Sequence, residues 1–222
     1  MNTRRKTAAL FFAAVLIAGT TLAANPARIK FNFNPSWLLH IGDQPGAHNP
    51  EFDDTEWKTV HLPAAFNEDE AFAKSIHDLT DTVVWYRKHF KIPSTYKNQK
   101  VFIEFEGLRQ AAEIWINGRE IGLHENGVMA FGLDLTDHLV FGNKENVIAL
   151  RIDNDWKYKE KATGTGFQWN NNNFNANYGG LTKNVVLHIC GKLYQTLPLY
   201  SHLGTVGTYV YATDINVRDK TA

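Results

Sequence analysis

Apolar and polar residues alternate at period two in several segments of the chain. In residues 101–106, Val101, Ile103 and Phe105 share one face, and Glu104 and Glu106 lie on the other. Successive side chains of a β-strand point to opposite faces of its sheet, so this pattern predicts a half-buried strand. The same alternation predicts strands over residues 84–92, 112–116, 148–152 and 185–189.

The connections between these segments favour antiparallel pairing. Asn117-Gly118 separates two of them and predicts a tight hairpin, because a type I′ turn needs positive φ at both central residues. No stretch after residue 24 has a long helical period, and the best helical candidate, residues 65–79, is expected to form a loop with a short helix at most. The sequence therefore predicts an all-β fold, an antiparallel β-sandwich of the jelly-roll type.

Irregular composition marks the loops and one domain boundary. Residues 42–56 are rich in Gly, Pro and Asp and predict turns, and residues 163–180 are rich in Asn, Gly and aromatic residues. Residues 24–191 are expected to form the sandwich, followed by a linker-like stretch and a fresh alternating strand within residues 192–222. A lone strand cannot hold an independent domain, so it either pairs back onto the sandwich or begins a second domain. We favour the second interpretation.

The first 23 residues have the layout of a secretory signal peptide. Arg4, Arg5 and Lys6 precede an unbroken apolar run over residues 8–18, and Thr21 and Ala23 are small residues at the −3 and −1 positions of a cleavage site. The run is shorter than the roughly 20 residues that span a bilayer. We expect export to the periplasm or the medium, with no membrane span after cleavage. A short N-terminal membrane anchor is the alternative.

Composition excludes several classes of function. The chain has 222 residues, of which 44% are hydrophobic, and its 23 Lys and Arg balance 23 Asp and Glu. This apolar content excludes a disordered chain. The absence of a net positive charge argues against a nucleic-acid partner. Cys190 is the only cysteine, so neither an internal disulfide nor a cysteine-based metal site is expected.

Catalytic motifs are absent from the sequence. It lacks a zinc-protease H-E-x-x-H motif, a P-loop, a dinucleotide-binding glycine motif and a nucleophile elbow. The carboxylate clusters Asp53-Asp54 and Glu68-Asp69-Glu70 are expected to be solvated turns. Neighbouring acids on a polar loop do not provide the two carboxylates that a glycosidase places across a sugar.

The loop that precedes Gly179-Gly180 has the residue types of a sugar site. Amide side chains donate and accept hydrogen bonds from hydroxyl groups, and aromatic rings stack on the C–H faces of sugars. The candidate residues for binding are Trp169, Asn173, Asn175, Asn177 and Tyr178. The alternative is a polar low-complexity loop whose asparagines hydrogen-bond their own backbone.

Several motifs together resemble the N-terminal sugar-binding domain of glycoside hydrolase family 2, which includes β-galactosidases, β-glucuronidases and β-mannosidases. Each motif is weak alone, but five of them occur in order at suitable spacing between about residue 36 and about residue 190. They comprise Phe52–Trp57 with Val60–Pro63, Trp85–Phe90, Asn117-Gly118 through Asp134–Thr136, Glu145-Asn146 with Ala149–Asn154, and Gly179–Val185.

This resemblance implies a galactose-binding-domain-like jelly roll followed by an immunoglobulin-like domain and a catalytic (β/α)₈ barrel. Residues 192–222 would be the linker and first strand of that second domain. Both catalytic glutamates of the family lie in the barrel, so no catalytic residue, cofactor or metal is expected in this chain. In some relatives the loop before the Gly-Gly motif reaches the active site, which carries a glycan-contacting role over to Asn173, Asn175 and Asn177.

The chain also departs from the family pattern. Ala64-Ala65-Phe66 replaces a frequent His-Asp-Trp, and Thr182-Lys183-Asn184 replaces Tyr-Arg-Asp. The remaining motif residues have structural interpretations: Trp85 and Tyr86 as sandwich packing, and Arg87 as a paired surface residue.

Three functions remain open on the sequence alone. We favour a non-catalytic carbohydrate-binding and scaffold portion of an exported family 2 glycosidase, with a β-galactoside-like glycan and the catalytic barrel as partners. An autonomous, lectin-like carbohydrate-binding module is the alternative. The third is a structural domain that docks onto a barrel or another subunit and contacts no sugar.

Overall fold

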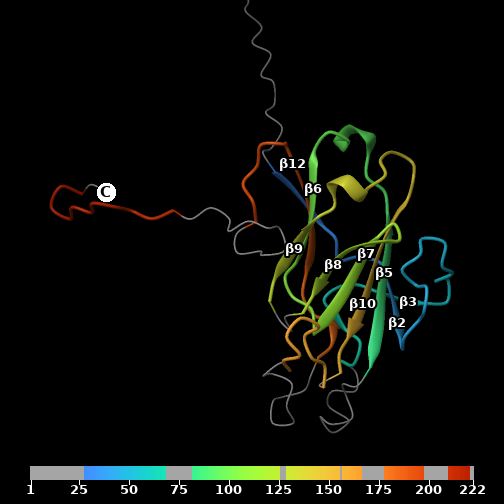
Figure 1. Cartoon of the computed structure of the whole chain (residues 1–222). Coiled ribbons are helices and arrows are strands. Elements are labelled where there is room, and N and C mark those ends of the chain that lie inside the picture. Colours follow the sequence, from blue (N-terminus) through green and yellow to red (C-terminus); the bar gives the residue numbers. More distant parts are fainter. Residues whose placement is uncertain are drawn as a thin grey trace, which may run out of the picture.

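The computed structural model describes residues 28–68, 82–125, 129–155, 157–166, 178–197 and 210–220. Two antiparallel sheets face each other (Figure 1). In spatial order, the four-stranded sheet contains β1 (Arg28–Asn32), β12 (Val185–Cys190), β6 (Lys100–Phe105) and β9 (Phe131–Asp134). The six-stranded sheet contains β3 (Lys58–Val60), β2 (Trp37–Ile41), β5 (Val83–Phe90), β10 (Asn146–Asp153), β7 (Ala111–Ile116) and β8 (Arg119–His124). The expected all-β antiparallel sandwich is confirmed.

Four short elements accompany the two sheets in the described residues. β4 (Ala64–Ala65) and β11 (Gly180–Leu181) form a two-stranded ribbon. Two single-turn 3₁₀ helices, η2 (Ser94–Tyr96) and η3 (Thr136–His138), connect strands. The candidate helix at 65–79 lies mostly outside the described residues, and its first residue belongs to β4.

The core lies between the two sheets and contains the alternating residues. Val101, Ile103 and Phe105 of β6 are fully buried, as are Ile114 and Ile116 of β7. The inward residues of β10 and β12 join the same cluster: Ile148, Leu150, Ile152, Val185, Leu187 and Ile189. The period-two pattern therefore correctly predicted which side chains face the core, because alternation fixes which side chains share one face of a sheet.

The Asn117-Gly118 hairpin joins β7 and β8 as predicted. Asn117 has φ 51° and Gly118 has φ 80°, the two positive values that a type I′ turn needs. The Asn117 amide also accepts a hydrogen bond from the Val147 backbone N–H at 2.9 Å and donates one to the His138 carbonyl at 2.9 Å. These bonds fix the hairpin against β10 and η3.

Segment 42–57 covers the outer face of the six-stranded sheet. Arg87, on β5, is fully buried beneath it and donates to Asp54 and to the backbone carbonyls of Ala47 and Asn49. The sequence-based view of Arg87 as a surface residue and of Asp54 as solvated is therefore wrong, although Asp53 is exposed. The polar loop buries these charges because it supplies hydrogen-bond acceptors for the whole guanidinium group.

Trp85 and Tyr86 pack as expected, but on opposite faces of β5. Tyr86 lies in the main core, and Trp85 belongs to a smaller cluster beneath segment 42–57. Trp85 stacks on Trp115 with ring centroids 5.5 Å apart. The six-stranded sheet is thus packed on both faces.

The residues after β12 continue along the four-stranded sheet. Tyr194 packs on Phe102 with ring centroids 5.0 Å apart, Arg28 donates to the Gln195 carbonyl, and Leu197 is buried. The first part of the expected linker is therefore packed on the sandwich. Residues 210–220 form turns and extended backbone and are exposed, and an immunoglobulin-like domain beginning in this region stays a prediction.

Candidate carbohydrate-binding site

The β4–β11 ribbon positions the one predicted sugar-binding residue that the structure describes, Tyr178. The Phe66 backbone N–H donates to the Gly179 carbonyl at 3.0 Å, and the Gly179 N–H donates to the Asn67 side chain at 3.0 Å. Tyr178, immediately before this pair, is 37% exposed. The other predicted sugar-binding residues lie outside the described residues; they are Trp169, Asn173, Asn175 and Asn177.

Close packing accounts for the Gly179-Gly180 pair. A Cβ atom at Gly179 would overlap the Phe66 ring and the Asn154 amide, and one at Gly180 would overlap the Tyr86 hydroxyl. Gly180 also has φ 92°, which side-chain-bearing residues rarely adopt. The glycine motif is thus needed for the ribbon to approach Tyr86 of β5 and Asn154, which follows β10.

Asn154, which the sequence analysis did not select, lies against this ribbon. The residue is 2% exposed, and among the residues that the structure describes neither of its amide atoms has a hydrogen-bond partner. Its backbone N–H donates to the Thr82 carbonyl at 3.0 Å. The sequence feature that could have identified Asn154 is its position at the end of the motif over residues 149–154.

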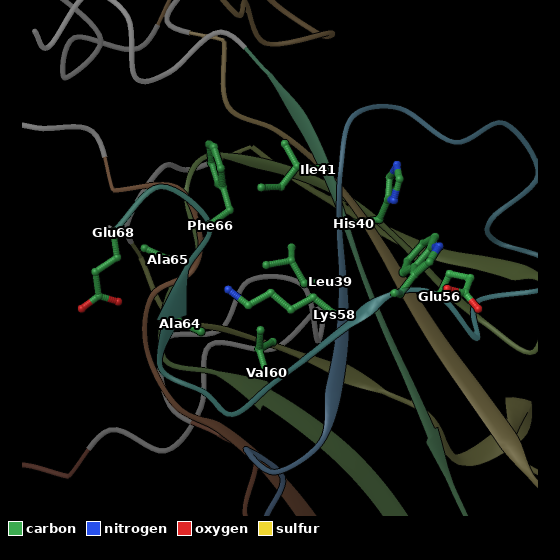
Figure 2. A pocket seen from close by; sticks show the side chains of 11 residues that line it. Leu39, His40, Ile41, Glu56, Lys58, Val60, Ala64, Ala65, Phe66 and Glu68 are labelled. Carbon is green, nitrogen blue, oxygen red and sulfur yellow. The ribbon is translucent and has the colours of Figure 1, made fainter. Parts of the chain in front are cut away.

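A groove of about 410 Å³ lies beside the ribbon, along β2, β3 and β4 (Figure 2). Its lining combines apolar, aromatic and charged side chains. Leu39, Val60, Trp57, Phe66, Glu56, Lys58 and Glu68 are among the lining residues. Sequence reasoning did not find this groove, because its residues come from three separate segments that only the tertiary structure brings together.

Trp57 is the largest side chain of the groove and is held from several sides. Its ring lies 5.3 Å from the His40 ring and 5.7 Å from the Phe52 ring, between centroids. The Arg87 guanidinium lies 5.9 Å from the Trp57 ring centroid. The His40 Nε2 is in turn 2.8 Å from the Gln44 side-chain nitrogen.

Several carboxylates of the sandwich form ion pairs. Asp43 binds Arg151 at 2.7 Å, and Asp134 binds Lys100 at 2.6 Å. The hydrogen bond from Arg151 holds the pKa of Asp43 below its usual range. Within the described ranges, no cluster of three or more His, Cys, Asp or Glu residues is arranged to hold a metal ion.

Comparison with known proteins decides the family. Residues 62–186 match the family model described as "Glycosyl hydrolase 2 galactose-binding domain-like". The chain belongs to this family. The family 2 domain is 40% identical over 204 residues to a β-glucuronidase of Formosa agariphila, which covers 89% of this chain and 21% of the relative. It is 38% identical over 128 residues to a β-galactosidase of Thermoanaerobacter pseudethanolicus, over 57% of this chain and 17% of the relative.

Solved structures agree with this assignment. A β-glucuronidase from glycoside hydrolase family 2 matches the family 2 domain with a TM-score of 0.73 and 40% identity, over 85% of this chain and 20% of that one. A Bacteroides uniformis β-glucuronidase matches with a TM-score of 0.61 and 28% identity, over 73% of this chain and 18% of that one. The chain spans about a fifth of the length of these relatives.

The lining of the groove contains two glutamates. Figure 2 places Glu56 and Glu68 at opposite ends of the groove, with Leu39, Lys58 and Val60 between them. The described part of the family 2 domain also has no helix long and apolar enough to cross a membrane.

Proposed function

We propose that this sandwich is the non-catalytic sugar-binding and scaffold domain of a longer family 2 glycosidase. The observation that carries the proposal is the match of most of the chain to only about a fifth of glycosidases that are much longer. The engagement of Asp43, Asp54 and Asp134 in ion pairs supports it, because these carboxylates hold the fold together. The chemistry would then be supplied by the catalytic barrel, its partner.

The sugar contact is assigned to the end of the sandwich that carries the β4–β11 ribbon. Tyr178 provides an exposed aromatic ring there, on a backbone fixed by the hydrogen bonds of Gly179. Trp169, Asn173, Asn175 and Asn177 precede it in sequence and complete the proposed contact. Relatives carry the names β-glucuronidase and β-galactosidase, so a β-glucuronide and a β-galactoside are the two ligands to compare.

The binding test is a titration of the ¹⁵N-labelled chain with methyl β-glucuronide and methyl β-galactoside, followed by NMR. We expect glycoside-dependent shifts for Tyr178 and its neighbours, and their loss in Tyr178→Ala. Tyr211→Ala is the matched control, because Tyr211 is exposed on the segment after the sandwich. No shift with either glycoside would contradict sugar binding and favour the purely structural alternative.

Two measurements distinguish the scaffold assignment from an autonomous binding module: the DNA sequence downstream of the gene and the affinity of the chain for glycans. A barrel-coding frame downstream of codon 222 supports the scaffold assignment. Intergenic sequence, together with glycan binding as tight as that of free-standing lectins, would favour the module.

Export is part of the same proposal. The charged and apolar N-terminal segments support cleavage near Ala24 and delivery to the periplasm or the medium. N-terminal sequencing of the protein expressed in a bacterial host tests it. A mature protein that still begins at Met1 and stays in the cytoplasm would contradict export.

A further inference from the structure

His89 joins two parts of the outer face that lie far apart in the sequence. It lies near the end of β5, and its side chain is 30% exposed. Its Nε2 is 2.9 Å from the Oδ2 of Asp54, in segment 42–57, and its Nδ1 is 3.0 Å from the Oε2 of Glu145, the residue before β10. One imidazole ring therefore bridges the loop that covers the sheet and the turn that leads into β10.

This bridge has a chemical requirement. An ionised carboxylate accepts hydrogen bonds and donates none, so each ring nitrogen that binds a carboxylate must carry a proton. Only the charged imidazolium form has both protons, whereas the neutral ring has one N–H group and one bare acceptor nitrogen. The geometry around His89 is thus that of an imidazolium. Histidine is also the side chain whose charge ordinarily changes between about pH 5 and pH 8.

Two positive and two negative groups meet here when His89 is charged. The Arg87 Nε lies 2.5 Å from the same Asp54 oxygen that His89 binds. Loss of the His89 proton leaves Arg87 alone against Asp54 and Glu145. The two carboxylates differ in environment, because the side chain of Asp54 is 10% exposed and that of Glu145 is 52% exposed. Water can solvate the exposed carboxylate when it is unpaired, at far lower cost than the buried one.

Within the described ranges, no other charged group forms a hydrogen bond or ion pair with this ring. β10 contributes Val147, which pairs with His89 and is apolar and buried. The pair between β2 and β5 that lies closest to His89 joins Leu38 to Arg87, so β2 adds no charge of its own. Lys88 lies on the opposite, inner face of β5. Exposed ionisable side chains close by in sequence form no such contact with the ring; they are Glu51, Asp53, Glu56, Lys91 and Lys144.

We propose that His89, Asp54 and Glu145 form a proton-dependent clasp: the charged ring ties segment 42–57 to the start of β10, and the neutral ring holds Asp54 and releases Glu145. The neutral ring keeps its N–H on Nε2, because an acceptor that is left unsatisfied costs more when it is buried. Glu145 then becomes an unpaired negative charge at the surface. The clasp makes no use of the proposed sugar contact, so the two proposals fail independently.

NMR of the chain labelled with ¹³C and ¹⁵N follows both ends of the clasp. The ring nitrogens of His89 are assigned by their disappearance in His89→Gln. We expect both to carry protons at pH 5.5 and only Nε2 to carry one at pH 8.5. The carboxyl carbon of Glu145 should shift over the same pH step, and this shift should be absent in His89→Gln. The usual pKa of a glutamate is about 4.3, so a shift in this range reports the state of the ring.

Matched variants test the contact with Glu145. Glu145→Gln should lower the proton affinity of His89 by up to about fivefold, the effect of losing one partly exposed ion pair. Glu120→Gln should leave that affinity unchanged, because Glu120 is also exposed but lies on β8, the far edge strand of the same sheet. A ¹H–¹⁵N spectrum of each variant shows that the fold is retained.

Three results would overturn the clasp. A neutral ring that is protonated on Nδ1 would keep Glu145 and release Asp54 instead. A Glu145 carboxyl carbon that does not move between pH 5.5 and pH 8.5 would show that the ring does not control this side chain. Equal effects of Glu145→Gln and Glu120→Gln on the proton affinity of His89 would show that Glu145 does not bind the ring.

Discussion

Arg87 and Asp54 form a buried ion pair on the outer face of the six-stranded sheet, with the Arg87 Nε 2.5 Å from the Asp54 Oδ2. The Arg87 side chain is fully buried and that of Asp54 is 10% exposed. His89 binds the same Asp54 oxygen at 2.9 Å. This carboxylate thus ties segment 42–57 to β5 and indirectly supports Trp57, which the Arg87 guanidinium contacts.

Replacing Asp54 should destabilise the sandwich. Asp54→Asn leaves a buried guanidinium without its counter-charge, a change that typically costs about 3–5 kcal/mol. Urea unfolding followed by Trp fluorescence measures it. The neighbouring Asp53→Asn is the control, because Asp53 is exposed, and it should change stability far less. Equal effects of the two variants would show that the ion pair does not hold the loop.

Acid should weaken the fold through the same carboxylate. Burial alone would raise the pKa of Asp54, but hydrogen bonds from His89 and Arg87 outweigh it and hold that pKa below its usual value. A lowered folded-state pKa gives stability that is present above the unfolded value, about 3.9, and is lost as pH falls through the folded value.

Urea midpoints measured from pH 6 down to pH 2.5 test this dependence. We expect a steady fall below about pH 4. The fall should be shallower in Asp54→Asn, which has no carboxylate to titrate. Asp153 acts in the opposite direction, because burial raises its pKa, so it favours the folded state as pH falls. A chain that becomes more stable in acid, or an Asp54→Asn variant with the same slope, would contradict the assignment to Asp54.

Gly180→Ala should disrupt the β4–β11 ribbon. Its positive φ costs a side-chain-bearing residue about 1–2 kcal/mol, and its Cβ would also overlap the Tyr86 hydroxyl. We expect a total loss of about 3 kcal/mol or more, since overpacking of a core adds to the backbone strain. Gly164→Ala is the matched control: Gly164 has φ 68°, with no atom within 4 Å of its Cβ position. Similar losses of stability for Gly180→Ala and Gly164→Ala, measured by thermal unfolding, would mean that close packing at Gly180 contributes nothing.

The residues that follow β12 should stabilise the sandwich. Ending the chain at residue 191 removes Tyr194 and Leu197 and uncovers Phe102, whereas ending it at residue 197 keeps these contacts. Burial of one large apolar side chain contributes about 1.5–3 kcal/mol, so the chain that ends at 197 should be the more stable by about that amount or more. Equal urea midpoints would show that residues 192–197 do not support the sandwich.

Sequence patterns predicted the inner faces of the sheets and missed what covers the outer face. Alternation identified Val101, Ile103 and Phe105, because a strand has only two faces and one must be apolar. Nothing in that period indicates whether a loop packs on the second face. The alternation of Trp85 and Arg87 with inward residues of β5 was the sequence feature that could have indicated this cover, since a tryptophan on a solvated strand face would expose a large apolar side chain to water.

The candidate site was predicted in the same uneven way. Tyr178 was selected from the composition of one contiguous loop, and its role in sugar binding stays a prediction. The groove was missed because Leu39, Trp57 and Phe66 lie on three segments whose meeting depends on the β2–β3 register and the β4–β11 ribbon. Asn154 was missed for a related reason: only its burial against Gly179 makes its amide unusual.

The central claim is that this sandwich is non-catalytic and that the catalytic residues lie in another part of a longer protein. An assay for hydrolysis of aryl glycosides tests this claim most directly. The purified chain is incubated with p-nitrophenyl β-glucuronide and p-nitrophenyl β-galactoside, and the released nitrophenol is measured. The account predicts no release above that of a protein-free blank. Release that scales with the concentration of the chain, and that disappears in Glu56→Gln or Glu68→Gln, would contradict it.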